Sequence, residues 1–330
     1  MTTSSQQFPI RTRCPLCGYS DVKPLLKGRP DYEYGVSVSL PYAFCQNPAC
    51  GLVFASAMPT TEVIQGFYTK YSTHGEYHPT SAIAMLLALA SSKLRKRSLM
   101  SLFDGKDVVN IKVLDYGCGA GDFMRQLTRF GIKHVAGYDF DPMACRHVRA
   151  LGLQAFETQD EFEAAGPYDY IFLNHVIEHL SDPVASLTEL ASYLGYGGRL
   201  VVRTPNAESF LAQLFGSNWR GWETPRHLHV FNPRSSRQLV AAANIPGCKI
   251  IKANTSNAMF FGMFHESFHA SFWHHSKVGK LLRHLTCMVI LPVAYIANGL
   301  RRDIGEEVCF ILEKEHFKSG EGKGAAAKLP

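Results

Sequence analysis

The feature of the sequence that most constrains its fold is a glycine-rich turn behind a short apolar run, in the segment KVLDYGCGAGDF at residues 112–123. The apolar run ends at Asp115, and Gly117, Gly119 and Gly121 follow it, so a tight turn into a helix is predicted. Glycines in such a turn let backbone N–H groups approach a ligand closely at the N-terminus of the helix. The spacing G-x-G-x-G is neither the G-x-G-x-x-G of dinucleotide-binding folds nor the phosphate-binding loop that ends in lysine.

The same alternation of apolar runs and helical patterns continues along the chain. Apolar runs occur at 111–115, 134–138, 152–156, 168–173 and 199–203, with further strands predicted near 248–253 and 307–314. Helical patterns separate most of them, at 121–130, 142–151 and 181–194, and another follows at 234–244. This pattern predicts an α/β fold with a doubly wound, seven-stranded, mostly parallel sheet.

The length of 330 residues and the composition predict a soluble globular chain of about two domains. Apolar residues make up 46% and charged residues 19%, which excludes a disordered chain or a fibre. We expect a zinc-ribbon-like module at 1–58, a helical connector at 59–107, an α/β domain at 108–318 and a disordered tail at 319–330. The segments 206–232 and 255–305 break the alternation and are predicted to be insertions over the carboxyl edge of the sheet.

Net charge and hydropathy indicate which partners and which cellular compartment to expect for the protein. The net charge of +6 is too weak a bias to indicate nucleic-acid binding. No hydrophobic signal follows Met1, and the longest apolar run, 285–298, is interrupted by Pro292 and is shorter than the roughly 20 residues that a membrane span needs. We therefore expect a cytoplasmic protein in which cysteines stay reduced.

Four of the nine cysteines form two closely spaced pairs near the N-terminus. Cys14 and Cys17 have the spacing C-x2-C, Cys45 and Cys50 have the spacing C-x4-C, and a glycine follows each pair. Two such turns can present four thiolates tetrahedrally, as in a closed structural zinc site. A segment this small builds little core, so bound Zn²⁺ would supply its folding energy. The alternative is a set of four reduced, buried cysteines.

Polar residues also follow the second and fourth predicted strands. Asp139, in VAGYDFDP, lies 24 residues beyond Asp115, where a carboxylate can accept both hydroxyls of a ribose. Asn174 and His175 follow the strand in YDYIFLNHVIEHLSDP. Ligands of open α/β sheets bind at this carboxyl edge, so we expect these side chains to surround one ligand.

Together these motifs resemble a class I S-adenosylmethionine-dependent methyltransferase across residues 111–204. LDYGCGAG resembles the first motif of that family, GYDFDP its ribose-binding acid, YDYIFLNHVIEHLSDP its motif after the fourth strand and LGYGGRLVVRTPN its fifth-strand motif. The resemblance implies a Rossmann-like fold and S-adenosyl-L-methionine as the cofactor.

The resemblance also implies which residues hold the cofactor. The loop of Tyr116, Gly117, Cys118 and Gly119 would contact the methionine part, and Asp115 would orient its amino group. Asp139 would hold the ribose, Phe140 would lie beside the adenine, and Asn174 and His175 would border the sulfonium. The cysteine-rich segment is similar to a zinc-binding domain that precedes certain methyltransferases, sugar C-methyltransferases among them.

The run SNWRGWETPRHLHVFNP at 217–233 is predicted to lie on the acceptor side, and it resembles W-x-G-x-x-x-P-R-H-L-H-x-F of a bacterial branch of the family. Methyl transfer needs an acceptor in line with the S–CH3 bond and often a base. We expect His227 to be that base, with Glu223 close enough in sequence to orient it, and His175 as second choice. The alternative is that Arg226 and one histidine of this run only hydrogen-bond it to the sheet.

His175, Glu178 and His179 formally match the metallopeptidase pattern H-x-x-E-H. Their position behind a predicted cofactor loop argues against metal-dependent hydrolysis.

We predict a methyltransferase of a small acceptor, a sugar or a glycan precursor, with no nucleic-acid partner. The alternatives are a lipid-linked or macromolecular acceptor and a cofactor-binding scaffold without activity. The apolar run within 277–302 is flanked by basic residues, so it is either a membrane-surface helix or a buried one.

Overall fold

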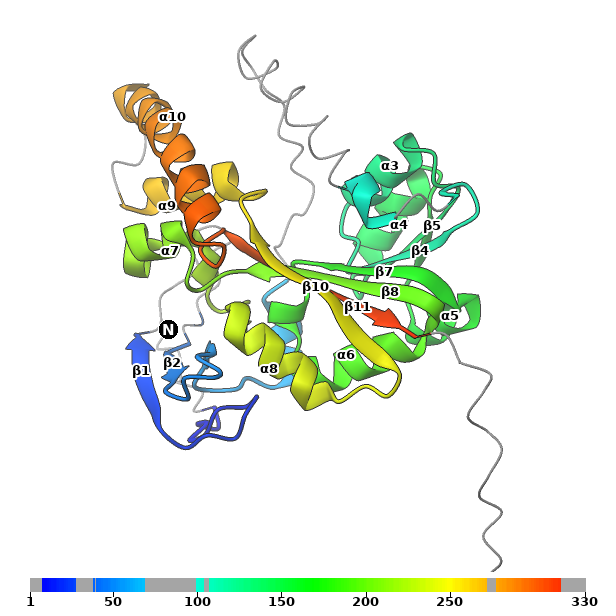
Figure 1. Cartoon of the computed structure of the whole chain (residues 1–330), viewed down its shortest axis with the longest axis horizontal. Coiled ribbons are helices and arrows are strands. Elements are labelled where there is room, and N and C mark those ends of the chain that lie inside the picture. The colour runs from blue at the N-terminus through cyan, green and yellow to red at the C-terminus, as the bar shows by residue number, and fades with distance from the viewer. Residues whose placement is uncertain are drawn as a thin grey trace, which may run out of the picture.

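The computed structural model describes residues 8–27, 38, 40–68, 99–103, 107–271 and 277–315. These residues form a seven-stranded sheet with helices on both faces and a separate four-stranded antiparallel sheet (Figure 1). Most of the predicted connector at 59–107 and the whole of the predicted tail at 319–330 lie outside the described residues.

The large sheet has the strand order β10-β11-β8-β7-β4-β5-β6. Neighbouring strands from β8 to β6 pair in parallel, whereas β11 is antiparallel to both β8 and β10. The predicted seven-stranded, mostly parallel α/β sheet is therefore confirmed. Its strands are β4 (Lys112–Tyr116), β5 (His134–Tyr138), β6 (Gln154–Phe156), β7 (Tyr168–Asn174), β8 (Leu194–Pro205), β10 (Cys248–Ser256) and β11 (Glu307–Lys314).

Both faces of this sheet are buried because neighbouring residues of each strand enter different cores. Val113 packs with α3 and α4 on one face, while Leu114 packs with α5, α6 and α8 on the other. The helices are α3 (Asp122–Arg129), α4 (Pro142–Ala150), α5 (Gln159–Ala165), α6 (Pro183–Ser192) and α8 (Pro233–Ala243), and the short helix η1 (Ser101–Phe103) joins the first face.

Capping residues in the local sequence determine where two of these helices, α4 and α6, begin. Asp141 and Asp182 each accept a hydrogen bond from a backbone N–H of the first turn, and a proline follows each of them. Side-chain caps of this kind satisfy N–H groups that have no partner within the helix. The loops that precede α4 and α6 are thereby fixed at the carboxyl edge of the sheet.

The small sheet does not belong to the N-terminal segment alone. Its order is β1 (Val22–Leu26), β2 (Tyr42–Cys45), β3 (Val53–Ala55) and β9 (His229–Val230), and β9 comes from the predicted insertion at 206–232. Val53 pairs with Val230, and Phe54 pairs with His229. The N-terminal segment and the insertion therefore form one structural unit.

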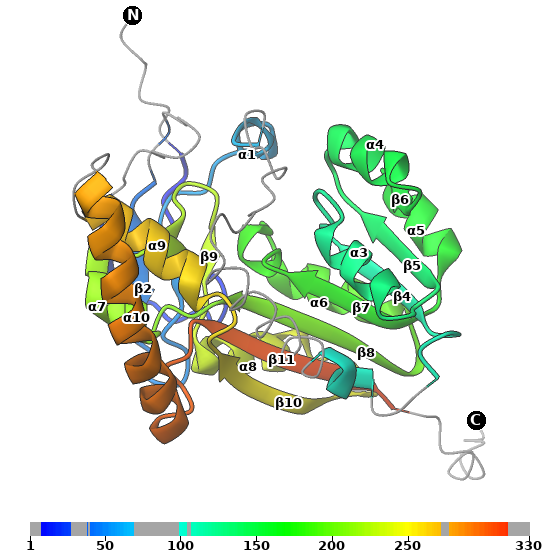
Figure 2. The same cartoon turned by 90° about the horizontal axis from the view of Figure 1, so that it is seen from above.

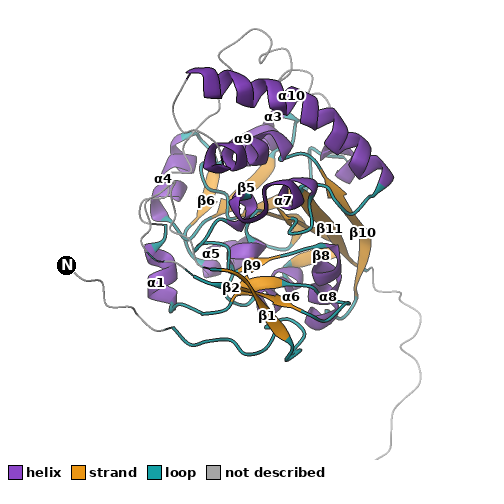
Figure 3. Ribbon diagram, turned by 90° about the vertical axis from the view of Figure 1, so that its left-hand side faces the viewer, coloured by secondary structure: helices purple, strands orange, loops and turns teal. Residues whose placement is uncertain are grey.

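A third hydrophobic core joins this sheet to α1 (Thr61–Gly66), from the predicted connector, and to helices of both insertions. The insertion helices are α7 (Phe210–Phe215), α9 (Phe260–Ser271) and α10 (Lys277–Leu300), and the short turns η2 (Ile177–His179), η3 (Gly216–Asn218) and η4 (Arg220–Trp222) lie nearby. Figures 1 and 2 show α7, α9 and α10 together, on the side of the molecule away from α5, and Figure 3 looks onto that side.

Helix α10 is apolar yet largely uncovered along one face. Ala294 is buried against the third core, but most of the larger apolar side chains are exposed. The exposed residues are Leu285, Met288, Val289, Val293, Tyr295, Ile296 and Leu300. The predicted alternative of a fully buried helix is thus wrong for this face. Within the residues described, no helix is long and apolar enough to cross a membrane.

Candidate functional site

The predicted cofactor loop connects β4 to α3 at the carboxyl edge of the sheet. Gly117 has φ of 79°, and a Cβ atom there would lie 2.5 Å from Cγ2 of Val176, in the loop after β7. Only glycine therefore fits without displacing that loop. The N–H of Gly119 donates to Oδ2 of Asp139 at 2.9 Å, and the N–H of Asp141 donates to its Oδ1 at 3.0 Å. These two bonds hold the Asp139 carboxylate at the end of β5, in the place predicted for a ribose-binding acid.

Asp115 lies near the carboxyl end of β4, at the same edge of the sheet. Its carboxyl group is buried, and Oδ1 accepts a hydrogen bond from Nδ2 of Asn174 at 3.5 Å. Burial, which outweighs that hydrogen bond, raises the pKa of Asp115 to about 7. A cationic amino group bound here would favour the ionised form of this carboxyl.

His175 follows β7 in a left-handed backbone conformation, with φ of 57°. Its Nε2 atom donates to Oε1 of Glu307 at 2.7 Å, and its Nδ1 atom lies 3.5 Å from Oε1 of Glu178. Burial alone would lower the pKa of His175, but the two glutamates outweigh it and raise the pKa to about 10. His175 is therefore a cation at neutral pH.

In the structure, His227 and Glu223 of the predicted acceptor side lie beside Glu178, which is far from them in the sequence. Nε2 of His227 lies 3.4 Å from Oε2 of Glu223 and 3.9 Å from Oε1 of Glu178, and its ring is 4.7 Å from that of His179. His227 and Glu178 are buried, with 2% and 0% of their surface exposed. Two of the predicted catalytic residues, His227 and Glu223, thus share one cluster with Glu178 and His179.

The hydrogen bonds of His227 define its tautomer. Nδ1 must donate to the backbone oxygen of Gly221 at 2.8 Å, because a carbonyl can only accept. Burial lowers the pKa of His227 to about 4, despite the opposing charge of Glu223. The imidazole is therefore neutral, with the lone pair of Nε2 directed to the side that carries Glu178 and Glu223.

Glu223 is held in place by its basic neighbours. It accepts from Nε of Arg226 at 3.0 Å and is also paired with Arg220. Burial by itself would raise the pKa of Glu223, but Arg220, His227 and Arg226 lower it. Glu223 therefore remains ionised and orients its neighbours.

Tyr68 was missed by the sequence analysis, because nothing in its local pattern distinguishes it. Its ring lies 5.2 Å from that of Phe140 and 5.9 Å from that of His179, both edge to face. Phe140 is half exposed, as expected of a residue that would flank an adenine. Tyr68 thus connects the predicted cofactor edge with the His227 cluster.

The small sheet supports the cluster from behind. The hydroxyl of Tyr42 donates to the backbone oxygen of His227, and the N–H of Leu228 donates to the backbone oxygen of Glu178 at 2.8 Å. The N–H of Ala55 donates in turn to the oxygen of Leu228 at 2.9 Å. His229 lies apart from the cluster, in β9, with Nε2 3.4 Å from Nη1 of Arg11.

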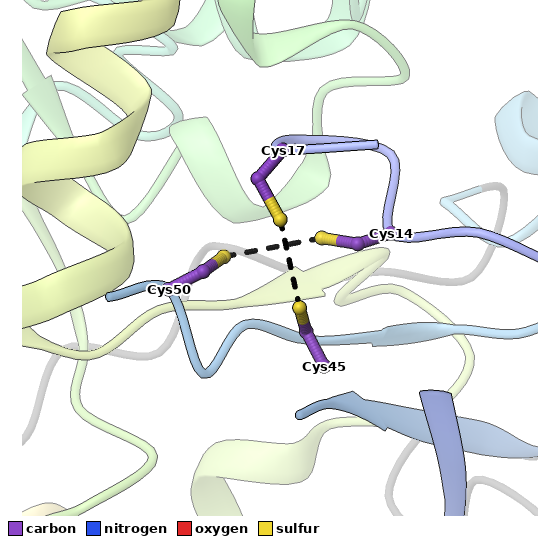
Figure 4. Close-up of side chains that lie close together, drawn as sticks. All are labelled: Cys14, Cys17, Cys45 and Cys50. Atoms are coloured by element: carbon purple, nitrogen blue, oxygen red, sulfur yellow. Dashed lines mark hydrogen bonds between the residues drawn. The ribbon is translucent and has the colours of Figure 1, made fainter. Parts of the chain in front are cut away.

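The four predicted metal ligands converge at one point (Figure 4). Sγ of Cys14 lies 3.9 Å from Sγ of Cys50, and Sγ of Cys17 lies 3.6 Å from that of Cys45. These distances exclude disulfides, whose sulfur atoms are about 2.05 Å apart. A tetrahedral Zn²⁺ with bonds of about 2.3 Å sets its sulfur ligands about 3.8 Å apart, so the four thiols fit the ion.

Thiol ionisation in this cluster is unequal without a cation. The hydrogen bond from Cys50 lowers the pKa of Cys14 to about 5, and the same contact raises that of Cys50. Burial raises the pKa of Cys45 to about 12. A divalent cation would allow all four sulfurs to be thiolates, the form that binds metal.

Comparison with known proteins agrees with this geometry. Residues 82–245 match the family model of a methyltransferase domain. The chain is 32% identical over 129 residues to a ubiquinone biosynthesis O-methyltransferase of Cereibacter sphaeroides, covering 36% of this chain and 52% of that protein. The corresponding protein of Xylella fastidiosa is 30% identical over 131 residues, covering 36% and 53%. The chain thus spans about half the length of the curated relatives it matches.

Two solved structures are also similar. A methyltransferase from Archaeoglobus fulgidus aligns with 18% identity and a TM-score of 0.41, covering 68% of this chain and 94% of that one. The plantazolicin methyltransferase BamL aligns with 15% identity and a TM-score of 0.45, covering 77% and 95%. From the family match and the motifs at the carboxyl edge, this chain contains a class I S-adenosylmethionine-dependent methyltransferase domain.

Proposed function

We propose that this protein transfers a methyl group from S-adenosylmethionine to a small-molecule acceptor. The observation that carries the proposal is the juxtaposition of two sites at one sheet edge: the Gly117–Asp139 cofactor loop and the buried His227 cluster, joined through Tyr68. In this proposal Asp139 holds the ribose, and Tyr116 to Gly119 contact the methionine part. Asp115 binds the amino group, and Asn174 borders the sulfonium.

In the proposed reaction the acceptor atom attacks the methyl carbon in line with the S–CH3 bond. That bond breaks as the bond from the acceptor to the methyl group forms, and its electron pair remains on sulfur in S-adenosylhomocysteine. An acceptor hydroxyl or acidic carbon also loses a proton, which Nε2 of His227 takes. The imidazole of His227 is held in place by Gly221, and the carboxylate of Glu223, 3.4 Å from Nε2, would stabilise the imidazolium that results.

The chemical class of the acceptor is a separate part of the proposal. The resemblance of the four-cysteine segment favours a sugar or glycan precursor, whereas the names of two relatives, O-methyltransferases of ubiquinone biosynthesis, suggest a hydroxyl on an intermediate of that pathway. Both acceptors present a hydroxyl, which a base such as His227 could deprotonate. Parallel assays with nucleotide-linked sugars and with catechol-type phenols would separate the two.

We also propose that the four cysteines bind a structural Zn²⁺. All four ligand positions are thiolates, so no coordination position is left open for substrate. The support is the fit of the sulfur distances to a tetrahedral site.

A peripheral contact with a membrane is a further part of the proposal. The exposed apolar face of α10 supports it, together with Arg301 just beyond the helix, whose side chain is 64% exposed. Such a face can lie in the interface while anionic lipids attract the flanking cation. Sedimentation with anionic vesicles checks it. Binding that survives in a Met288→Glu/Ile296→Glu variant would count against α10.

The proposed function is tested first by calorimetric titration with S-adenosylmethionine and S-adenosylhomocysteine. Asp139→Ala should weaken binding by about 1.5–3 kcal/mol, the scale of hydrogen bonds to a charged group. Asp141→Ala is the matched control, because Asp141 caps α4 and its backbone N–H remains. A preference for NAD, or unchanged affinity in Asp139→Ala, would overturn the cofactor assignment.

A further inference from the structure

The buried cluster beside the proposed acceptor site contains three side chains of metal-ligating type. One ligand atom from each of Glu178, His179 and His227 lies within 4.8 Å of the other two. Two of these residues come from the turn η2 and the third from the insertion that follows β8. Tertiary folding places His227 beside the neighbouring residues Glu178 and His179.

Both histidines of the cluster are oriented in the same way. Nδ1 of His179 donates to the backbone oxygen of Arg226 at 3.1 Å, and Nδ1 of His227 donates to that of Gly221 at 2.8 Å. An imidazole that donates through Nδ1 offers Nε2 as the ring atom that can bind a metal. A histidine that ligates a metal nearly always donates its other ring N–H to a carbonyl or carboxylate, which fixes the tautomer and ring orientation.

The carboxylate of Glu178 is fully inaccessible to solvent, and its one close cation among the described residues is His175, whose Nδ1 lies 3.5 Å from Oε1. His175 is shared, because its Nε2 binds Glu307 at 2.7 Å. Apart from that long contact, neither oxygen of Glu178 has a hydrogen-bond partner among these residues. A buried carboxylate facing an imidazole lone pair costs free energy unless a proton or cation lies between them.

We propose that Glu178, His179 and His227 bind one divalent transition-metal ion of the zinc class. Two imidazoles and one carboxylate are a donor set found in catalytic zinc sites. An ion with ligand bonds of about 2.1 Å sets its ligands about 3.4 Å apart, so binding would draw these three inward by a small distance. Glu223 is already paired with Arg220, which leaves a fourth position for water or an acceptor oxygen.

This site differs from the H-x-x-E-H pattern in the sequence. In that pattern His175 would be a ligand, but its Nε2 is bound to Glu307, and His227 takes its place. The role of the ion rests on the proposed function: an acceptor hydroxyl bound to it would be more acidic and would release its proton to solvent water. Nε2 of His227 would then be a ligand, so the base role of His227 belongs to the protein without the ion.

The test is metal stoichiometry in the full-length protein, stripped with a chelator and titrated with Zn²⁺ or Co²⁺ alone. Wild type should bind two equivalents per chain, while Glu178→Gln and His179→Gln should each bind one. Cys14→Ser/Cys45→Ser should lose the other equivalent and, with it, the thiolate-to-cobalt absorption. His265→Gln is the matched control, because this histidine also faces a glutamate, Glu266 at 3.2 Å, but lies outside the cluster.

Circular dichroism and S-adenosylhomocysteine affinity show whether each variant is folded, and His179→Gln replaces Glu178→Gln if the latter is not. One equivalent in wild type, or two in folded Glu178→Gln and His179→Gln, would overturn the second site. Cofactor titration is independent of this count. A chain that binds two ions but no S-adenosylmethionine would refute the proposed function and leave the metal site standing.

Discussion

His175 forms an ion pair with the buried Glu307, with Nε2 of the histidine 2.7 Å from Oε1 of the glutamate. The pair joins the carboxyl end of β7 to the first residue of the last strand, and Ser256 of β10 donates to the other oxygen of Glu307 at 2.7 Å. Because the pKa of His175 is raised to about 10, this histidine already carries a proton at neutral pH. A protonated imidazole cannot accept another proton, so the base role proposed here falls to His227.

Replacement of His227 by alanine should lower kcat by about 10²–10⁴-fold, the usual contribution of a general base. Cofactor affinity should be nearly unchanged, because the cofactor loop makes no hydrogen bond to His227 in the described part of the chain. Single-turnover methylation and calorimetry measure the two effects separately. His229→Gln is the control, and wild-type turnover in His227→Ala would show that alignment alone drives the reaction.

His175→Gln should destabilise the protein at pH 7 by on the order of 2–4 kcal/mol, because it leaves Glu307 without its cationic partner. The folded-state pKa of about 10 lies above the unfolded value of about 6.5. Its stabilisation is therefore fully present below pH 6.5 and is lost as the pH rises toward 10. Urea unfolding between pH 6 and 10 measures this slope, and an equal slope in the variant would contradict the assignment.

The affinity for S-adenosylmethionine should fall as the pH drops below about 7. Burial raises the pKa of Asp115 to about 7, and a carboxylate binds the cationic amino group only when it is ionised. Each pH unit below that value should weaken binding by up to about tenfold. Calorimetry from pH 5.5 to 8.5 measures the profile. Asp115→Asn should bind weakly with a flat profile, and a flat profile in wild type would exclude this role.

Removal of the metal ion proposed for the four-cysteine site should lower both stability and kcat. The cysteines hold the ends of β2 and β3, and Tyr42 in β2 donates to the backbone of His227. Elemental analysis should find one equivalent of metal fewer in Cys14→Ser/Cys45→Ser than in wild type, and the melting temperature of this variant should fall. Cys248→Ser, at a free cysteine outside the site, is the control. Wild-type melting and turnover in the double variant would show that the site supports neither.

Local sequence was sufficient to predict the parallel sheet, the glycine turn after β4 and the clustering of the four cysteines. Each depends on neighbouring residues: alternation fixes which strand residues are buried, Gly117 allows a positive φ, and the spacing of Cys14 and Cys17 suits one turn. Asp139 was also predictable, because a residue that ends a parallel strand lies at the carboxyl edge wherever the strand is placed.

Only the tertiary structure decided how the acceptor side is built. The pairing of Phe54 with His229 makes the N-terminal segment and the insertion one sheet, and no local pattern specifies pairing between strands so far apart. In the sequence, Glu307 is an ordinary charged residue at the start of a strand. Folding places its carboxylate against His175, which raises the pKa of this predicted second-choice base, so that His175 is a cation. Charge state and ligand geometry depend on which groups share a buried volume, and long-range packing alone determines that.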